Sequence, residues 1–136
     1  MIVALAIAMM LHSEPERVPN EAVKAFCIRL QKSKVTAIKF EGHGIAGKPP
    51  VGRFVRLQLK KSKDIARVLE AFKGSDRRKG TPEPGENVEI ADKFTFVESK
   101  AGKTEMHFLY VVPYEIKYDW GTSVMDMYKF LRKKAK

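Results

Sequence analysis

Three segments of the chain repeat apolar residues at the spacing of an α-helix. In each segment four apolar side chains fall at positions i, i+3, i+4 and i+7, which places them on one helix face. The three sets are Val23, Phe26, Cys27 and Leu30; Ile65, Val68, Leu69 and Phe72; and Val124, Met127, Tyr128 and Leu131. Each set follows a residue suited to cap a helix, namely Asn20, Ser62, or Ser123 with Asp126. The sequence therefore predicts three amphipathic helices that share one core.

Five further segments alternate apolar and polar residues or are rich in β-branched and aromatic residues, as strands are. They cover residues 35–41, 51–60, 94–98, 104–112 and 114–120. In the first of them, Thr36, Ile38 and Phe40 are expected on one face. In the fourth, His107 shares a face with Leu109 and Val111, which predicts a partly buried, hydrogen-bonded histidine.

The predicted order of elements is α-β-β-α-β-β-β-α, after an apolar amino-terminal element. Short connections between strands favour antiparallel pairing, and the helices do not alternate regularly with the strands. We therefore expect an α+β domain in which the helices cover one face of an antiparallel sheet of about five strands. A chain of 136 residues has the size of one domain. Residues 20–136 are assigned to that domain, and residues 1–19 to an apolar segment and a linker.

Residues 1–11 carry no charged side chain. Such a run is too short to span a bilayer, which takes about 17–25 residues. A buried element of the fold is the favoured interpretation, ahead of an export signal and of membrane contact. No Lys or Arg precedes the run, so export would require a start site upstream of Met1. The cytoplasm is favoured over export on this ground, and the lone Cys27 is compatible with both.

The chain is basic, with 26 Lys and Arg against 16 Asp and Glu and a net charge of +10. Residues 24–79 carry a net charge of +12, whereas residues 80–128 carry −5. Basic clusters precede and follow the second predicted helix, and a third ends the chain. We predict one positive surface over that helix, made of Lys60, Lys61, Lys63, Arg67, Arg77, Arg78 and Lys79. An acidic protein or a nucleic acid would fit it, although such residues also serve solubility alone.

Few residues suggest catalysis. Residues 42–47 spell G-x-G-x-x-G, but Lys48-Pro49-Pro50 and a strand follow instead of the helix that a dinucleotide site requires. His43 could act as a general base with Glu41 to orient it, but a solvated loop histidine is the favoured interpretation. His12, Cys27, His43 and His107 are too far apart in sequence to form a local metal-ligand pair. No catalytic residue, metal or cofactor is predicted.

These observations favour a non-catalytic binding module that engages an acidic macromolecule through a basic surface. Two alternatives stay open: an exported protein of unknown role, and a small enzyme with its site in the loop 42–50. The aromatic residues of segment 114–120 are expected in the core, because that segment lies in the acidic part of the chain. The oligomeric state is left open by the sequence.

Overall fold

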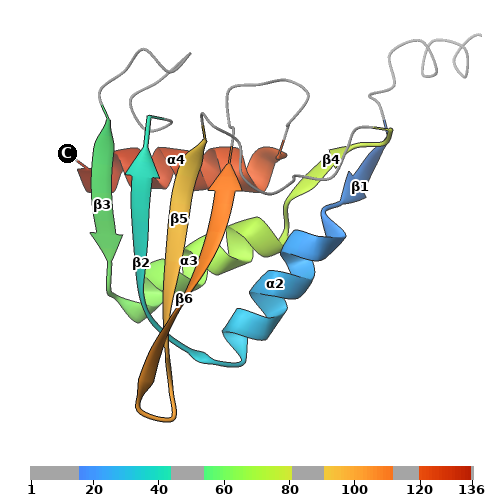
Figure 1. Ribbon diagram of the computed structural model, residues 1–136. Helices are drawn as coiled ribbons and strands as arrows, with labels where there is room; N and C mark the ends of the chain where they lie inside the picture. The colour runs from blue at the N-terminus through green and yellow to red at the C-terminus, as the bar shows by residue number, and fades with distance from the viewer. Residues whose placement is uncertain (1–15, 44–53, 81–90, 112–119, 136) are drawn as a thin grey trace, which may run out of the picture.

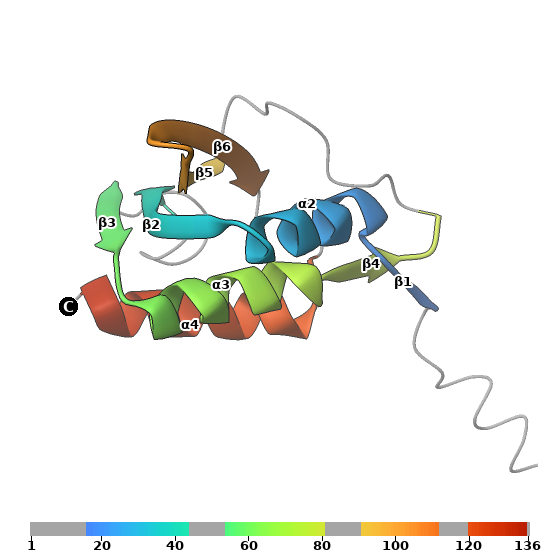
Figure 2. The ribbon, with the colours of Figure 1, turned by 90° about the horizontal axis from the view of Figure 1, so that it is seen from below.

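The chain folds into two layers, a four-stranded antiparallel sheet and three helices that all lie on one of its faces (Figures 1 and 2). The computed structural model describes residues 16–43, 54–80, 91–111 and 120–135. The helices are α2 (Glu21–Gln31), α3 (Ser62–Lys73) and α4 (Thr122–Ala135). The sheet has the order β3 (Val55–Leu59), β2 (Lys34–Gly42), β5 (Asp92–Lys100) and β6 (Lys103–Val111). The predicted α+β class and the three predicted helices are confirmed.

β2 pairs with β3 and β5 pairs with β6, which are neighbours among the strands of this sheet along the chain, and the two pairs join through β2 and β5 in the centre. Phe40 lies opposite Leu57 on β3 and opposite Phe94 on β5, so these apolar side chains share the face that meets the helices. A register shift between Val35 and Ala37 marks a β-bulge in β2. The bulge turns Val35 toward the core and leaves Thr36 exposed, so the predicted grouping of Thr36 with Ile38 and Phe40 is wrong.

A second, two-stranded sheet lies where no strand was predicted. It pairs β1 (Arg17–Pro19) antiparallel with β4 (Asp76–Arg78), and it joins the segment before α2 to the end of α3. Three residues per strand are too few for an alternation pattern to show in the sequence. The backbone N–H of Asp76 also donates to the carbonyl of Trp120 at 3.1 Å, which ties this sheet to the start of α4.

The core centres on a cluster of aromatic rings between the layers. Phe72 of α3 is fully buried and makes edge contacts with Phe94, Phe96 and Trp120, with ring centroids 4.9, 6.4 and 5.8 Å away. Phe94 also contacts the ring of Tyr128 on α4 at 6.0 Å. All three predicted apolar helix faces point into the core around this cluster. Phe26 is only partly buried, but its ring makes an edge contact with Phe96, with centroids 5.5 Å apart.

Segment 114–120, the fifth predicted strand, lies outside the described residues except at its end. Trp120 is buried, as expected, but it stands in the connection just before α4 and not in a strand. Within the described part of the chain, the sheet therefore consists of the other four predicted strands.

Candidate functional site

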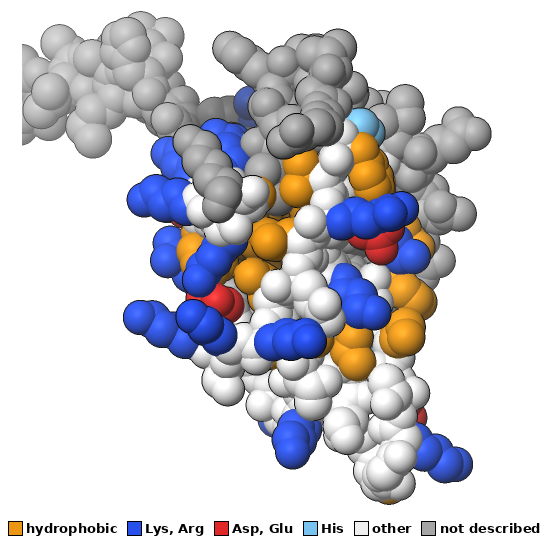
Figure 3. Space-filling model, turned by 90° about the vertical axis from the view of Figure 1, so that its left-hand side faces the viewer, with side chains coloured by type: hydrophobic (Ala, Val, Ile, Leu, Met, Phe, Trp, Pro, Cys, Tyr) orange, Lys and Arg blue, Asp and Glu red, His pale blue; other side chains and the backbone are white. Residues whose placement is uncertain are grey.

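The ends of two helices enclose a surface cavity of about 480 Å³, called here the α3–α4 cavity. Its lining includes Lys61, Lys63 and Arg67 from the first half of α3 and the residue before it, and Phe130 and Lys134 from the last turns of α4. The start of α3 and the end of α4 lie on the same side of the molecule (Figure 1). Viewed from that side, Lys and Arg side chains gather over the helical layer (Figure 3).

The cavity pairs its cations with an aromatic ring and a carboxylate. The guanidinium carbon of Arg67 lies 4.3 Å from the ring centroid of Phe130, and Lys134 Nζ lies 5.7 Å from the same centroid. Lys134 Nζ also contacts Asp64 Oδ2 at 3.1 Å. The lining carries four cationic side chains and two carboxylates, those of Asp64 and Glu70, so its net charge is positive. This composition suits an anionic ligand.

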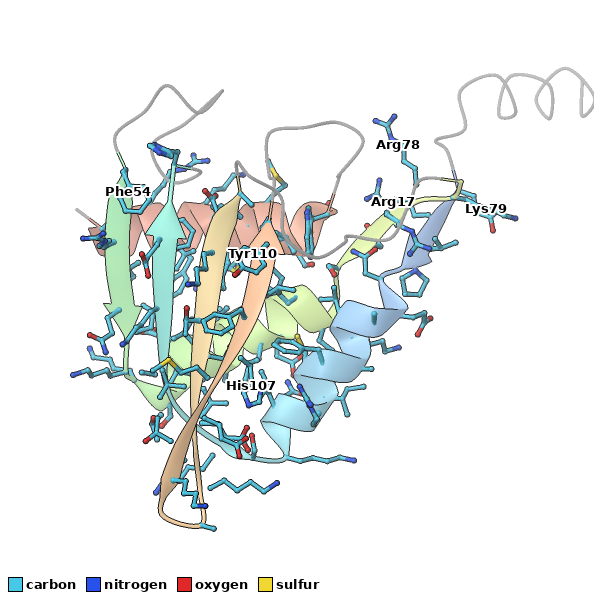
Figure 4. The ribbon with its side chains drawn as sticks, in the orientation of Figure 1. Arg17, Phe54, Arg78, Lys79, His107 and Tyr110 are labelled. Carbon is cyan, nitrogen blue, oxygen red and sulfur yellow. The ribbon has the colours of Figure 1, made fainter. Side chains whose placement is uncertain are left out.

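The second predicted basic cluster, Arg77 to Lys79, lies at the opposite end of α3 (Figure 4). Its side chains take part in the β1–β4 sheet. Arg77 Nη1 donates to the carbonyl of Pro19 at 2.8 Å, and Lys79 Nζ pairs with Glu16 at 3.3 Å. These contacts give the cluster a structural role in addition to its charge.

The seven predicted site residues are thus distributed over two places. Three of them, Lys61, Lys63 and Arg67, meet at the α3–α4 cavity, while Lys60 is exposed at the end of β3 nearby in the chain. The other three follow the far end of α3, a helix of 12 residues and therefore about 18 Å long. Continuity of all seven as one surface stays a prediction.

Sequence reasoning missed five members of the cavity lining, which are Asp64, Ala66 and Glu70 of α3 and Phe130 and Lys134 of α4. Lys134 belongs to the basic tail, which was recognised as a cluster, but nothing in the sequence indicates that α4 runs beside α3 and ends near its start. The pairing of the first and third clusters is a product of the tertiary fold.

The face of the sheet turned away from the helices, called here the open face, carries unusually large apolar side chains. Phe54, Met106 and Phe108 are 46%, 53% and 46% exposed, and Tyr110 is half-buried. Along β6, Met106, Phe108 and Tyr110 alternate with the helix-facing His107, Leu109 and Val111. Phe54 and Tyr110 stand toward opposite edges of the sheet (Figure 4). The signal for this face was present in the sequence, because the fourth predicted strand is apolar on both sides.

Cations stand among these rings on the open face. Lys93 Nζ lies 4.6 Å from the ring centroid of Phe108, and the guanidinium carbon of Arg56 lies 5.3 Å from that of Phe54. The strand register places two rows of side chains across this face. The first row, from β3 to β6, is Arg56, Glu41, Lys93 and Tyr110. In the next row Lys39 of β2 lies opposite Thr95 of β5, which in turn lies opposite Phe108 of β6. Glu41 pairs with Arg56 at 3.7 Å.

Two residues of the loop 42–50, Gly42 and His43, lie within the described part of the chain. The ring of His43 packs against Phe54 with centroids 5.3 Å apart, and Glu41 contacts Arg56. The backbone N–H of His43 donates to the buried carboxylate of Asp92 at 2.9 Å, and Tyr128 Oη donates to the same carboxylate at 2.9 Å. Residues 44–50 of that loop lie outside the described residues.

His107 is partly buried and hydrogen-bonded, as predicted. Its Nε2 lies 2.7 Å from Glu98 Oε2, and one ligand atom from each of Glu98, Glu105 and His107 lies within 4.8 Å of the others. Two carboxylates and an imidazole could hold a metal ion. Arg29, Lys32 and Lys34 line the same cavity, however, and their charges oppose a bound cation. The direct contact serves to join β5 to β6.

None of the helices in the described ranges is both long enough and apolar enough to cross a membrane. Comparisons with protein-family models, with curated proteins and with solved structures find no match to this chain.

Proposed function

We propose that this protein is a non-catalytic binding module that engages an acidic macromolecule through the basic surface around the α3–α4 cavity. The observation that carries the proposal is the convergence of Lys61, Lys63 and Arg67 with Lys134 of another helix around one cavity. Cations that merely keep a surface soluble have no need to meet in this way. Exposed lysines beside a guanidinium held over an aromatic ring offer both mobile and fixed positive charges to an anion.

The test is a double charge reversal at the cavity, Lys61→Glu with Lys63→Glu. Both side chains are exposed, so the variant keeps the core intact. Association is measured by anisotropy with duplex DNA, single-stranded RNA and heparin as labelled probes, each over a range of salt concentrations. For duplex DNA, each phosphate neutralised contributes about −0.9 to the slope of log affinity against log salt. We expect the reversal to weaken binding and to make that slope shallower by about two.

The matched control reverses Lys100 and Lys103 at the turn between β5 and β6. These two residues are exposed cross-strand neighbours at the tip of the hairpin, and their reversal changes the net charge by the same amount. The proposal requires the control to bind nearly as well as the unaltered protein. Equal loss in both variants, or salt-independent weak association with all three probes, would refute it.

A further inference from the structure

We infer that the open face of the sheet binds the bases of a single-stranded nucleic acid. The inference rests on the proposed function in taking the partner to be a polyanion, and it goes beyond that proposal by naming a second surface and the class of ligand. The starting observation is that three aromatic side chains, Phe54, Phe108 and Tyr110, stand on the one face of the sheet that no described helix covers.

The spacing of the rings suits an extended strand of nucleotides. Phe108 and Tyr110 are two residues apart on β6, which separates them by about 6.8 Å along the strand. Phe54 lies before β3 at the other edge of the sheet, roughly 14 Å across three strand spacings. Flat aromatic rings on a sheet are platforms for unstacked bases, and they accept any base because each base has a π face.

The charge of the open face complements the phosphates of such a ligand. Lys93 Nζ lies over the ring of Phe108 at 4.6 Å from its centroid, and the guanidinium carbon of Arg56 lies over the ring of Phe54 at 5.3 Å. Because both are long flexible side chains, a base that takes the place of the cation on either ring leaves that cation close to its phosphate. Lys39 adds a third positive charge on β2, the strand between β3 and β5. Among the described residues of the four strands, Glu41 is the carboxylate on this face, and Arg56 pairs with it.

A purely apolar docking surface would look different. A face built to bind an apolar protein surface would hold its rings together, with charges at the rim. Here Lys39 on β2 and Lys93 on β5 separate the rings of β6 from Phe54 at the opposite edge of the sheet. Bases in a duplex are stacked inside the helix and out of reach of these rings. The arrangement therefore predicts a preference for single strands over duplexes.

The experiment replaces flat rings by an apolar side chain that cannot stack, in the full chain. Phe108→Leu and Phe54→Leu are titrated with a single-stranded RNA and with a duplex of the same sequence, and circular dichroism checks that each variant folds. Because stacking contributes about 1–3 kcal/mol per base, we expect each variant to lose at least about fivefold in affinity for the single strand. Affinity for the duplex should stay unchanged. Phe108→Trp, which keeps a flat ring, should retain single-strand binding.

The control is Met125→Leu on α4, at an exposed apolar residue away from the open face, and it should change neither affinity. If Phe108→Leu leaves single-strand affinity unchanged, or changes only the self-association of the protein in sedimentation, the inference fails. That failure is separate from the failure of the proposed function, because reversal of Lys61 and Lys63 would still weaken both probes. Equal affinity of the unaltered protein for single strand and duplex would also overturn the inference.

Discussion

At the scale of single residues, the thiol of Cys27 shows how a chemically reactive group becomes structural. The side chain is fully buried on the core face of α2, between Val23 and Leu30. Burial raises the pKa of the Cys27 thiol from 9.0 to about 12, and the nearby carboxylate of Glu70 acts in the same direction. Because the thiolate is the nucleophilic form, the folded protein keeps the group unreactive at neutral and mildly alkaline pH.

We predict that iodoacetamide labels Cys27 slowly in the folded protein at pH 8.5, and rapidly once urea has unfolded it. The control is an exposed thiol on β5, Ser99→Cys in a Cys27→Ala background, which should react at the rate of a free thiol. Mass spectrometry over time measures both rates. Rapid labelling of Cys27 in the folded state, at a rate similar to the control, would show that α2 does not bury it as described.

The same pKa shift affects stability at high pH. The folded-state pKa lies above the unfolded-state value, so the thiol contributes its full stabilisation below about pH 9 and loses it as pH rises toward 12. The difference in unfolding free energy between the unaltered protein and Cys27→Ala should therefore decline over that range. Taking the difference cancels the titration of the lysines that the two proteins share.

The predicted helix caps make hydrogen bonds that the sequence did not indicate. Asn20, Ser62 and Ser123 were each expected to cap a helix. Asn20 does occupy the N-cap position of α2, but its side-chain Nδ2 donates to Ser75 Oγ at 3.1 Å and makes no capping hydrogen bond. Ser123 Oγ donates to the carbonyl of Ala71 on α3 at 2.8 Å. Ser62 is the first residue of α3, and the residue before it is Lys61. Capping rules describe local hydrogen bonds, whereas two of these side chains bond to a neighbouring element.

At the scale of elements, the connection from the core to α4 depends on one glycine. Gly121 has a φ of +88°, and a β-carbon there would collide with the carboxylate of Asp76. That carboxylate is already held by Arg17 at 2.7 Å, so it has little room to move. The left-handed backbone and the close approach together require glycine at this position.

We predict that Gly121→Ala lowers the unfolding free energy more than Gly102→Ala does. Gly102, in the β5–β6 turn, also has a positive φ, of +75°, but a β-carbon there would meet nothing within 4 Å. The control should thus lose only the backbone strain, about 1–2 kcal/mol, and Gly121→Ala should lose at least about 1 kcal/mol more. Urea denaturation of both variants measures the difference. Equal losses would show that Asp76 moves aside without cost.

The elements that the sequence predicted well are those with a long periodic signal. The three helices each have four apolar residues at helical spacing, and β6 is a nine-residue strand whose second half is rich in aromatic and other apolar residues. The strands β1 and β4 have three residues each, and the bulge in β2 shifts the alternation after Val35. Short strands and bulges depend on the hydrogen bonds to the strand beside them, so the local pattern of apolar and polar residues does not reveal them.

At the scale of the whole molecule, folding rearranges the charge pattern that the sequence presents. Along the chain the basic and acidic residues separate into blocks, and the sequence predicts that the aromatic residues of segment 114–120, in the acidic block, lie in the core. In space, Phe108 and Tyr110 of that block lie beside Lys93, and Lys39 from the basic block lies in the row of Phe108, two strands away. The α3–α4 cavity likewise joins clusters that are some seventy residues apart in sequence. The basic residues of the cavity stand out in the sequence as clusters, but their grouping in space could not be predicted from it.

The layers share one core, and this predicts that the described elements unfold together. The single tryptophan, Trp120, is buried against Phe72 of α3 and precedes α4, so its fluorescence reports the packing between the helices and the sheet. Far-ultraviolet circular dichroism reports the helices and strands themselves. In a urea titration we expect the two signals to change with the same midpoint and slope, as they do for one cooperative unit.

Phe72→Ala sharpens this test, because Phe72 contacts rings of the sheet and Trp120 at once. Truncation of a fully buried phenylalanine costs about 3–5 kcal/mol, so both midpoints should fall together by the same amount of urea. Met125→Ala, at a residue on α4 that is 48% exposed, should leave both midpoints nearly unchanged. If the fluorescence midpoint fell in Phe72→Ala while the dichroism midpoint stayed in place, the helices and the sheet would not form a single cooperative core.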